Sequence, residues 1–102
     1  MEYKDFGFFK GLPYKRCNEN FEDYKKLHNS ISKEEVLKHL ETVDFWLTSP
    51  PSYDLFTGEK LHAGVFHDGA FCFPYEFLHY YKNYDIGIPY EYEEYLKGKG
   101  VH

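Results

Sequence analysis

Histidine, aspartate and cysteine come together at one place in the sequence, where His67-Asp68 is followed by Cys72, and these residue types can carry nucleophilic catalysis. A cysteine acts as a nucleophile when a neighbouring base or positive charge holds it as the thiolate. The strand pairing predicted below puts Val65 opposite Cys72 and leaves His67 diagonal to the thiol. The pattern therefore favours Cys72 as a small buried hydrophobic residue over a catalytic nucleophile.

The six histidines raise the question of a metal site. Transition-metal sites usually combine a local pair of ligands with a more distant pair. His62 and His67 are five residues apart on a predicted strand, so they point to opposite faces. His39 and His79 fall on separate predicted helices, without Cys or carboxylate ligands at a suitable spacing. We therefore predict no metal, no cofactor and no enzymatic activity.

Tyrosines and carboxylates gather near the C-terminus, in "YDIGIPYEYEEY". One interpretation of this stretch is the solvated side of an amphipathic helix. The other is a protein-binding face, in which tyrosine anchors surrounded by acidic groups dock onto a basic partner. On the second interpretation the candidate partner-binding residues are Asp85, Tyr90, Glu91, Glu93 and Glu94.

The charge of the chain narrows the class of partner. Its 102 residues carry a net charge of -5, with a small basic excess confined to residues 1–16. An acidic chain without a basic stripe argues against direct nucleic-acid binding, which needs neutralisation of phosphates. It suits a basic protein partner instead.

No apolar run approaches the roughly 18 residues of a membrane span. With no secretory signal visible, we expect a cytoplasmic protein in which Cys17 and Cys72 are reduced.

The elements that must position these residues follow from the apolar pattern. The best-defined helix is "SISKEEVLKHLETV", where Ser32 is the N-cap and Glu35 completes a capping box. Val36, Leu37 and Leu40 then form its buried side. Shorter helices are predicted in "NENFEDYKKLHN", in "PYEFLHYYKNY" beginning at Pro74, and in "PYEYEEYLK" beginning at Pro89.

Two of the predicted strands are joined by a dipeptide that favours a β-hairpin turn. Asp68-Gly69 is a dipeptide that favours a two-residue turn, and closing the turn there pairs Phe66 with Phe71. The strands are expected at about Asp44–Ser49, Lys60–His67 and Ala70–Phe73.

The predicted fold is α+β, a single domain over residues 1–102 in which a small antiparallel sheet of about three strands packs against helices. Residues 1–16 form an irregular arm lying across the domain. Eleven Tyr, ten Phe and one Trp exceed what one small core can hide, so several rings must lie near the surface. The core is predicted to contain Trp46, Phe66, Phe71, Phe73, Phe77 and Tyr81.

The C-terminal part of the chain, "HDGAFCFPYEFLHYYKNYDIGIPYEYEEYL", resembles the small immunity proteins of bacterial polymorphic toxin systems, including contact-dependent growth inhibition. The resemblance covers about the last 45 residues and consists of the hairpin, the aromatic helix and the "IPxEYxxYL" ending. It implies a non-catalytic cytoplasmic inhibitor that binds a cognate toxin domain, often a nuclease, and blocks its active site.

Two other classes of protein stay open at this stage. One is a different protein-interaction module, such as a phage-encoded inhibitor or a nucleic-acid mimic, although the small surplus of acidic residues weighs against mimicry. The other is a small enzyme, which the lack of a clustered set of reactive residues disfavours. A neighbouring gene for a large secreted toxin would separate these classes from an immunity protein.

Overall fold

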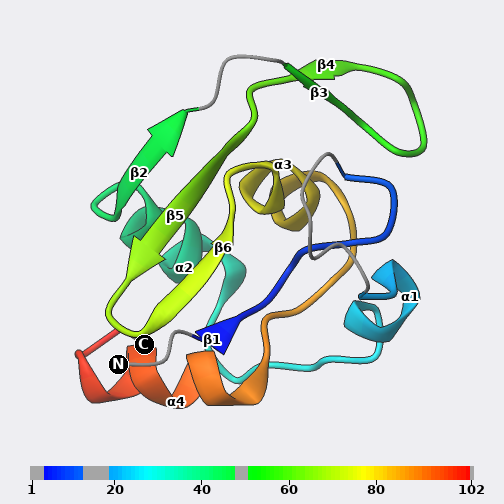
Figure 1. Cartoon of the computed structure of the whole chain (residues 1–102). Coiled ribbons are helices and arrows are strands. Elements are labelled where there is room, and N and C mark those ends of the chain that lie inside the picture. The colour runs from blue at the N-terminus through cyan, green and yellow to red at the C-terminus, as the bar shows by residue number, and fades with distance from the viewer. Residues whose placement is uncertain (1–3, 13–18, 48–50, 102) are drawn as a thin grey trace.

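One β-hairpin lies at the centre of the domain. The computed structural model describes residues 4–12, 19–47 and 51–101, and it shows an α+β fold, as the sequence predicts (Figure 1). Strands β5 (Gly64–Asp68) and β6 (Phe71–Pro74) form the hairpin at the centre of a four-stranded sheet. Its order is β1-β6-β5-β2, with β1 at Lys4–Asp5 and β2 at Asp44–Leu47.

The longer helices lie against one side of this sheet. Helices α2 (Lys33–Leu40) and α3 (Glu76–Asn83) lie behind it in the view of Figure 1, and α4 (Tyr90–Gly98) closes its lower end. The short α1 (Phe21–Tyr24) lies to one side. The predicted cap of α2 is confirmed, because the backbone N–H of Glu35 donates to the Ser32 hydroxyl.

The N-terminal arm corrects the predicted sheet. Within the arm that was predicted to be irregular, Lys4–Asp5 pairs in parallel with Phe71–Cys72 and makes the sheet mixed. After β1 the chain turns inward, and Phe6 and Phe9 are buried.

The predicted strand Lys60–His67 is divided into two separate strands. Its first part, β4 (Lys60–Leu61), pairs with β3 (Ser52–Tyr53) in a separate two-stranded sheet.

The hairpin closes two residues further along β6 than the sequence suggests. Phe66 pairs with Phe73 rather than with Phe71, and Gly69 takes the positive φ of the turn. Asp68 is therefore a strand residue, and its buried carboxylate accepts hydrogen bonds from other elements. A shift of two residues keeps the alternation of faces, so the aromatic side chains still point inward. The same shift leaves Pro74 at the end of β6, and α3 begins at Glu76.

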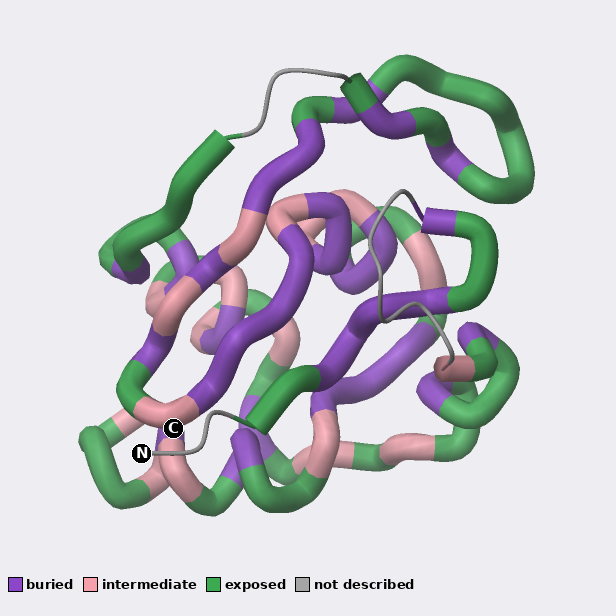
Figure 2. Tube along the Cα trace, viewed as in Figure 1, coloured by how far each residue is buried: buried purple, intermediate pink, exposed green. Residues whose placement is uncertain are grey.

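The core consists mainly of aromatic rings. Five of the six predicted core residues are buried, namely Phe66, Phe71, Phe73, Phe77 and Tyr81. The arm adds Phe6, whose ring stacks on Phe73 with centroids 4.6 Å apart, and Phe9, whose ring meets the edges of Phe21 and Tyr24. The tube in Figure 2 is buried along β6, at alternate residues of β5 and at residues 6–9 of the arm, which together enclose this core.

Trp46 is the exception, and its predicted burial is wrong. The indole side chain is 70% exposed, because β2 is an edge strand and Trp46 pairs with Val65 on the face turned away from the helices. Its ring packs beside His67, with centroids 4.9 Å apart. The backbone of β2 lies so close to Gly64 that a Cβ there would stand 2.1 Å from the Trp46 carbonyl oxygen. Figure 2 shows β2 as an exposed strand.

Candidate partner-binding groove

The five predicted partner-binding residues do not share one surface. Tyr90 and Glu91 are exposed in the first turn of α4, and both line a groove. Asp85 is exposed but lines a different depression, beside the start of α2. Glu94 is exposed outside the groove. Glu93 faces the interior and is 5% exposed, so it is removed from the candidate binding surface.

The burial of Glu93 has a structural cause. Its carboxylate accepts hydrogen bonds from the backbone N–H groups of Ser30 and Ile31 and from the side-chain amide of Asn29. Burial acts to raise the pKa of Glu93, but these hydrogen bonds outweigh it and lower the pKa below its ordinary value. Glu93 therefore fastens the loop before α2 to α4.

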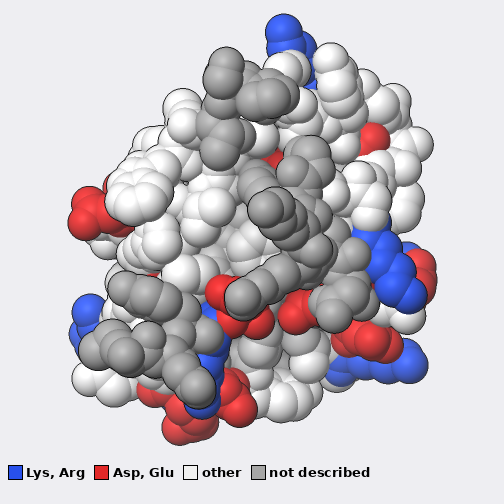
Figure 3. All heavy atoms as spheres, viewed as in Figure 1, with Lys and Arg blue, Asp and Glu red and all other residues white. Residues whose placement is uncertain are grey.

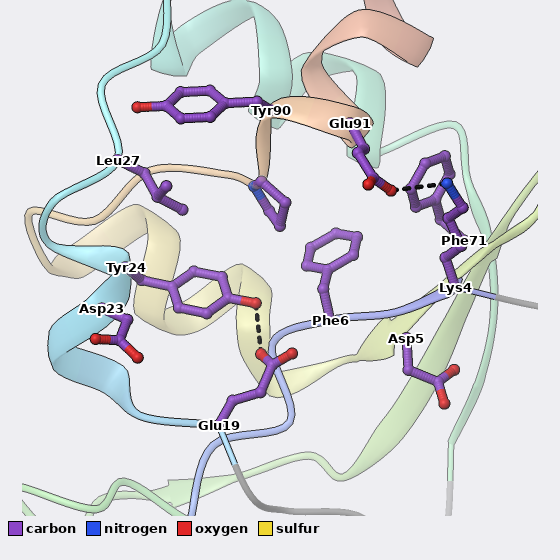
Figure 4. A pocket seen from close by; sticks show the side chains of 11 residues that line it. Lys4, Asp5, Phe6, Glu19, Asp23, Tyr24, Leu27, Phe71, Tyr90 and Glu91 are labelled. Carbon is purple, nitrogen blue, oxygen red and sulfur yellow. Dashed lines mark hydrogen bonds and ion pairs between the residues drawn. The ribbon is translucent and has the colours of Figure 1, made fainter.

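The groove holding Tyr90 and Glu91 is assembled from four separate parts of the chain, one of which contributes Phe71 of β6 alone (Figure 4). Strand β1 and the residue after it form one side, the α1 region forms another, and the start of α4 closes the third. Its volume is about 450 Å³. The pairing of Lys4 with Phe71 shapes the groove, because it holds the arm beside the hairpin and next to α4.

Rings form the apolar lining of the groove. Phe6 and Phe71 are buried; Phe6 directly follows β1 and Phe71 begins β6, while Tyr24 enters from α1. Leu27 and Pro89 complete the apolar part. In Figure 4 the Phe6 ring lies at the centre of the labelled side chains, with Tyr90 above it.

A hydrogen-bonded cluster fixes the lower wall. The Tyr24 hydroxyl donates to Glu19 Oε2 at 2.5 Å, and the backbone N–H of Gly7 donates to the same carboxylate oxygen at 2.8 Å. Burial, together with the bond to Glu19, raises the pKa of Tyr24 far above its ordinary value, so it remains a neutral hydroxyl. Gly7 has φ +78°, and a Cβ there would meet the Phe77 ring at 2.7 Å. The wall is thus held by a backbone shape that only glycine fits.

The rim of the groove is acidic. Asp5, Asp23 and Glu91 are exposed and come from β1, α1 and α4, and the half-buried Glu19 lies between them. In the described part of the chain, Lys4 is the one lysine that lines the groove, and its ammonium contacts Glu91 Oε2 at 2.8 Å. Figure 3 shows acidic side chains on the lower half of this face, with basic side chains interspersed among them. Negative charge therefore surrounds an aromatic floor.

Most of this site could not be assigned from the sequence. Asp5, Phe6, Glu19 and Asp23 belong to the part of the chain read as a basic arm and its following helix. A usable signal was the placement of Glu19 and Asp23 four residues apart, ahead of and within a predicted helix. The sequence did not indicate the parallel pairing of β1 with β6, because this pairing joins two distant parts of the chain.

The described histidine and cysteine side chains do not form a second candidate site that is as well defined as the groove. The predicted pairing of Val65 with Cys72 is wrong, because the shifted register pairs His67 directly with Cys72 and brings Nδ1 to 3.3 Å from the sulfur. Burial, followed by the charge of Asp5, raises the pKa of the Cys72 thiol, which favours the protonated and unreactive form. Within residues 4–12, 19–47 and 51–101, no three His, Cys, Asp or Glu side chains are arranged to hold a metal ion. Cys17 lies outside the described residues.

Two buried aspartates serve the fold. Asp68 accepts hydrogen bonds from the hydroxyls of Tyr92 at 2.6 Å and Tyr95 at 3.2 Å, and its Oδ2 lies 2.9 Å from His39 Nε2. Asp54 shapes the loop between β3 and β4. Burial acts to raise its pKa, but hydrogen bonds from the backbone of that loop, from His79 and from the Tyr84 hydroxyl lower it to about 2.

Comparison of the chain with models of protein families, with curated protein sequences and with solved structures found no match. In the described part of the chain, no helix has the length and apolar character needed to cross a membrane. The groove itself is therefore the starting point for a functional proposal.

Proposed function

We propose that the protein is a non-catalytic inhibitor that binds another protein, and specifically an immunity protein that neutralises a cognate bacterial toxin domain in the cytoplasm. The observation that carries this proposal is the groove, in which an acidic rim surrounds aromatic side chains. Rings at a binding surface provide large contact areas that lose little conformational entropy, and charged rims accelerate association with an oppositely charged partner.

The charge of the groove indicates the kind of toxin. A nuclease collects phosphates with Lys and Arg, so its substrate cleft is basic. Asp5, Asp23 and Glu91 come from different elements and would all face such a cleft at once. An inhibitor docked there would block the substrate by occupying the cleft, without any chemical step of its own.

Exposed apolar side chains elsewhere offer further contact area. Phe45, Trp46 and Leu47 of β2 and Phe56 of the β3–β4 loop are each between 45% and 70% exposed. Clusters of exposed aromatic residues are typical of protein–protein interfaces. They support a protein partner over a small-molecule substrate.

Co-expression with a toxin tests this proposal. The toxin domain encoded next to this gene would be expressed in a host cell, with and without the protein. We expect growth arrest by the toxin alone, restored growth on co-expression, and a stable complex in size-exclusion chromatography. A Glu91→Lys and Asp23→Lys double variant should protect poorly while remaining folded. If the wild-type protein neither protects nor forms the complex, the immunity function is wrong.

A separate experiment tests whether the toxin is a nuclease. Purified toxin domain should degrade nucleic acid, and equimolar addition of the protein should stop this reaction. A toxin that is inhibited but cleaves no nucleic acid would keep the inhibitor function and would remove the nuclease from it.

A further inference from the structure

We propose that the groove receives one arginine side chain of the partner, and that this guanidinium replaces the ammonium of Lys4 on Glu91. This inference rests on the proposed function, because it names the chemical group that the partner would insert. It adds that the protein occupies its own binding site with Lys4 when the partner is absent.

The contact between Lys4 and Glu91 is the first step of the argument. The ammonium and carboxylate are 2.8 Å apart, and the two side chains are 60% and 68% exposed. An exposed ion pair of this kind contributes little to stability, since water and salt compete with it. A cation from outside can therefore displace Lys4 at a small cost. The pair also demonstrates that this edge of the groove binds a cationic nitrogen.

Lys4 contacts one edge of the groove and leaves most of its aromatic lining uncovered. Lys4 approaches from the β1 side and reaches Glu91 at one edge, as Figure 4 shows. Phe6 lies at the centre of the view, and Tyr90 and Tyr24 lie on the other sides of the groove. A planar guanidinium can stack on such rings while donating two parallel hydrogen bonds to a carboxylate. The compact lysine ammonium cannot do both, so the lining favours arginine.

The charges favour a single cation entering from outside. Glu91, Asp5 and Asp23 stand on three sides of the opening, and Glu19 lies deeper. Among the described residues, Lys4 is the only lysine in the lining. Even without Asp5, the three acids Glu19, Asp23 and Glu91 outnumber Lys4 in the described lining. Adding one guanidinium while Lys4 stays nearby is therefore favourable on electrostatic grounds.

The walls of the groove are also held in place before binding. β1 is bonded into the sheet, with the Phe6 N–H donating to the Cys72 carbonyl at 3.0 Å. Tyr24, Glu19 and Gly7 hold one another in the wall below. Because these elements are already ordered, a bound side chain pays little to organise the site.

The test uses short peptides and needs no toxin. The ¹⁵N-labelled protein is titrated with acetyl-Gly-Arg-Gly-amide, and its amide NMR signals are followed. The matched control is the peptide with citrulline, which keeps the shape of arginine but has no charge. We expect saturable shifts at Phe6, Gly7, Tyr90 and Glu91 with the arginine peptide, and at most a tenth of that affinity with citrulline. Equal binding of both peptides, equal binding of a lysine peptide, or shifts elsewhere on the surface would overturn the inference.

Lys4→Ala gives the sharper result. Removing the internal competitor should strengthen binding of the arginine peptide by about two- to fivefold, the range expected for an exposed ion pair. Glu91→Gln should weaken it by more than that factor. The control is Lys25→Ala, which removes a comparable exposed pair with Glu22 outside the groove and the same unit of charge. If Lys4→Ala and Lys25→Ala change the affinity equally, Lys4 does not occupy the site.

The outcomes separate this inference from the proposed function. Peptide binding at the groove in a protein that does not protect against the toxin would leave the arginine site intact and would remove the immunity function. If Glu91→Gln and Lys4→Ala variants still protect and bind the toxin with unchanged affinity, the immunity function stands and the arginine site is removed. In that case the toxin is bound through another surface.

Discussion

The interior and the groove both contain carboxylates, but they use them in opposite ways. Asp68 and Glu93 are buried, and each accepts at least three hydrogen bonds or close polar contacts from groups that belong to other elements. Asp23 and Glu91 are exposed around the groove. The first pair connects elements of the fold, whereas the second pair presents charge to the surroundings.

The difference shows that local sequence does not decide the role of an acidic residue. Glu91 and Glu93 are two residues apart on the same helix, yet one lies at the groove and the other lies in the interior. On a helix, two residues correspond to about 200° of rotation, which places the two side chains on opposite faces. Whether the inner face is occupied by a ring or by a carboxylate then depends on which donors the neighbouring loop supplies.

The largest expected effect is at the interior carboxylate Asp68. Asp68→Ala should lower the free energy of unfolding by about 3 kcal/mol, because the hydroxyl of Tyr92 and the ring of His39 lose their acceptor inside the protein. The measurement is urea denaturation followed by tyrosine fluorescence. Asp44→Ala, at an exposed position of β2, is the control and should change little. Equal losses in the two variants would contradict the division between interior and surface acids.

The next effect is on the pH dependence of stability. The pKa of Asp54 lies at about 2, below its ordinary value of 3.8, so the ionised carboxylate stabilises the folded state. This contribution is complete above about pH 3.8 and is lost as the pH falls towards 2, by about 2 kcal/mol in total. Asp54→Asn should therefore flatten the stability profile in this window. A profile parallel to that of the wild type would show that Asp54 is not the responsible group.

A smaller effect is expected at the groove when the partner is bound. Tyr90→Ala should shorten the lifetime of the toxin complex about tenfold, since aromatic anchors act mainly on dissociation. Surface plasmon resonance at two salt concentrations measures this, and the change should be the same at both. Tyr53→Ala is the matched control, because Tyr53 is exposed to a similar degree but lies outside the groove. If both variants dissociate at the same rate, Tyr90 is not an anchor.

The smallest effect is on the stability of the free protein. Glu91→Gln should change the free energy of unfolding by less than about 0.5 kcal/mol, because its pair with Lys4 is exposed to solvent. Thermal denaturation monitored by circular dichroism is sufficient to measure it. A loss as large as that of Asp68→Ala would mean that Glu91 belongs to the fold, and the comparison of the two kinds of carboxylate would fail.

The elements that local patterns specify were predicted correctly. Helix α2 follows from the Ser32 cap and the spacing of Val36 and Leu40, both of which are buried. The hairpin follows from the alternation of aromatic residues around Asp68-Gly69. The inward faces were right even though the register was shifted by two residues, since the side-chain period of a strand is two.

What could not be predicted depends on contacts between distant parts of the chain. The register of the hairpin is tied to Asp68, whose partners His39, Tyr92 and Tyr95 lie on two different helices. Trp46 lies on an edge strand, and nothing in "DFWL" distinguishes an edge from a centre. The groove depends on the two-residue strand β1, which is too short to leave a periodic pattern.

The parallel pairing of β1 also bears on when the protein can first act. A ribosome releases Lys4 and Asp5 long before it releases their partners Phe71 and Cys72, and Glu91 follows later still. The growing chain therefore carries Phe6 and Phe9 without the hairpin that buries them, and these rings are available to chaperones during synthesis. The groove closes only after α4 has emerged. A nascent chain arrested before residue 90 would contain most of the hydrophobic core and would still lack the site.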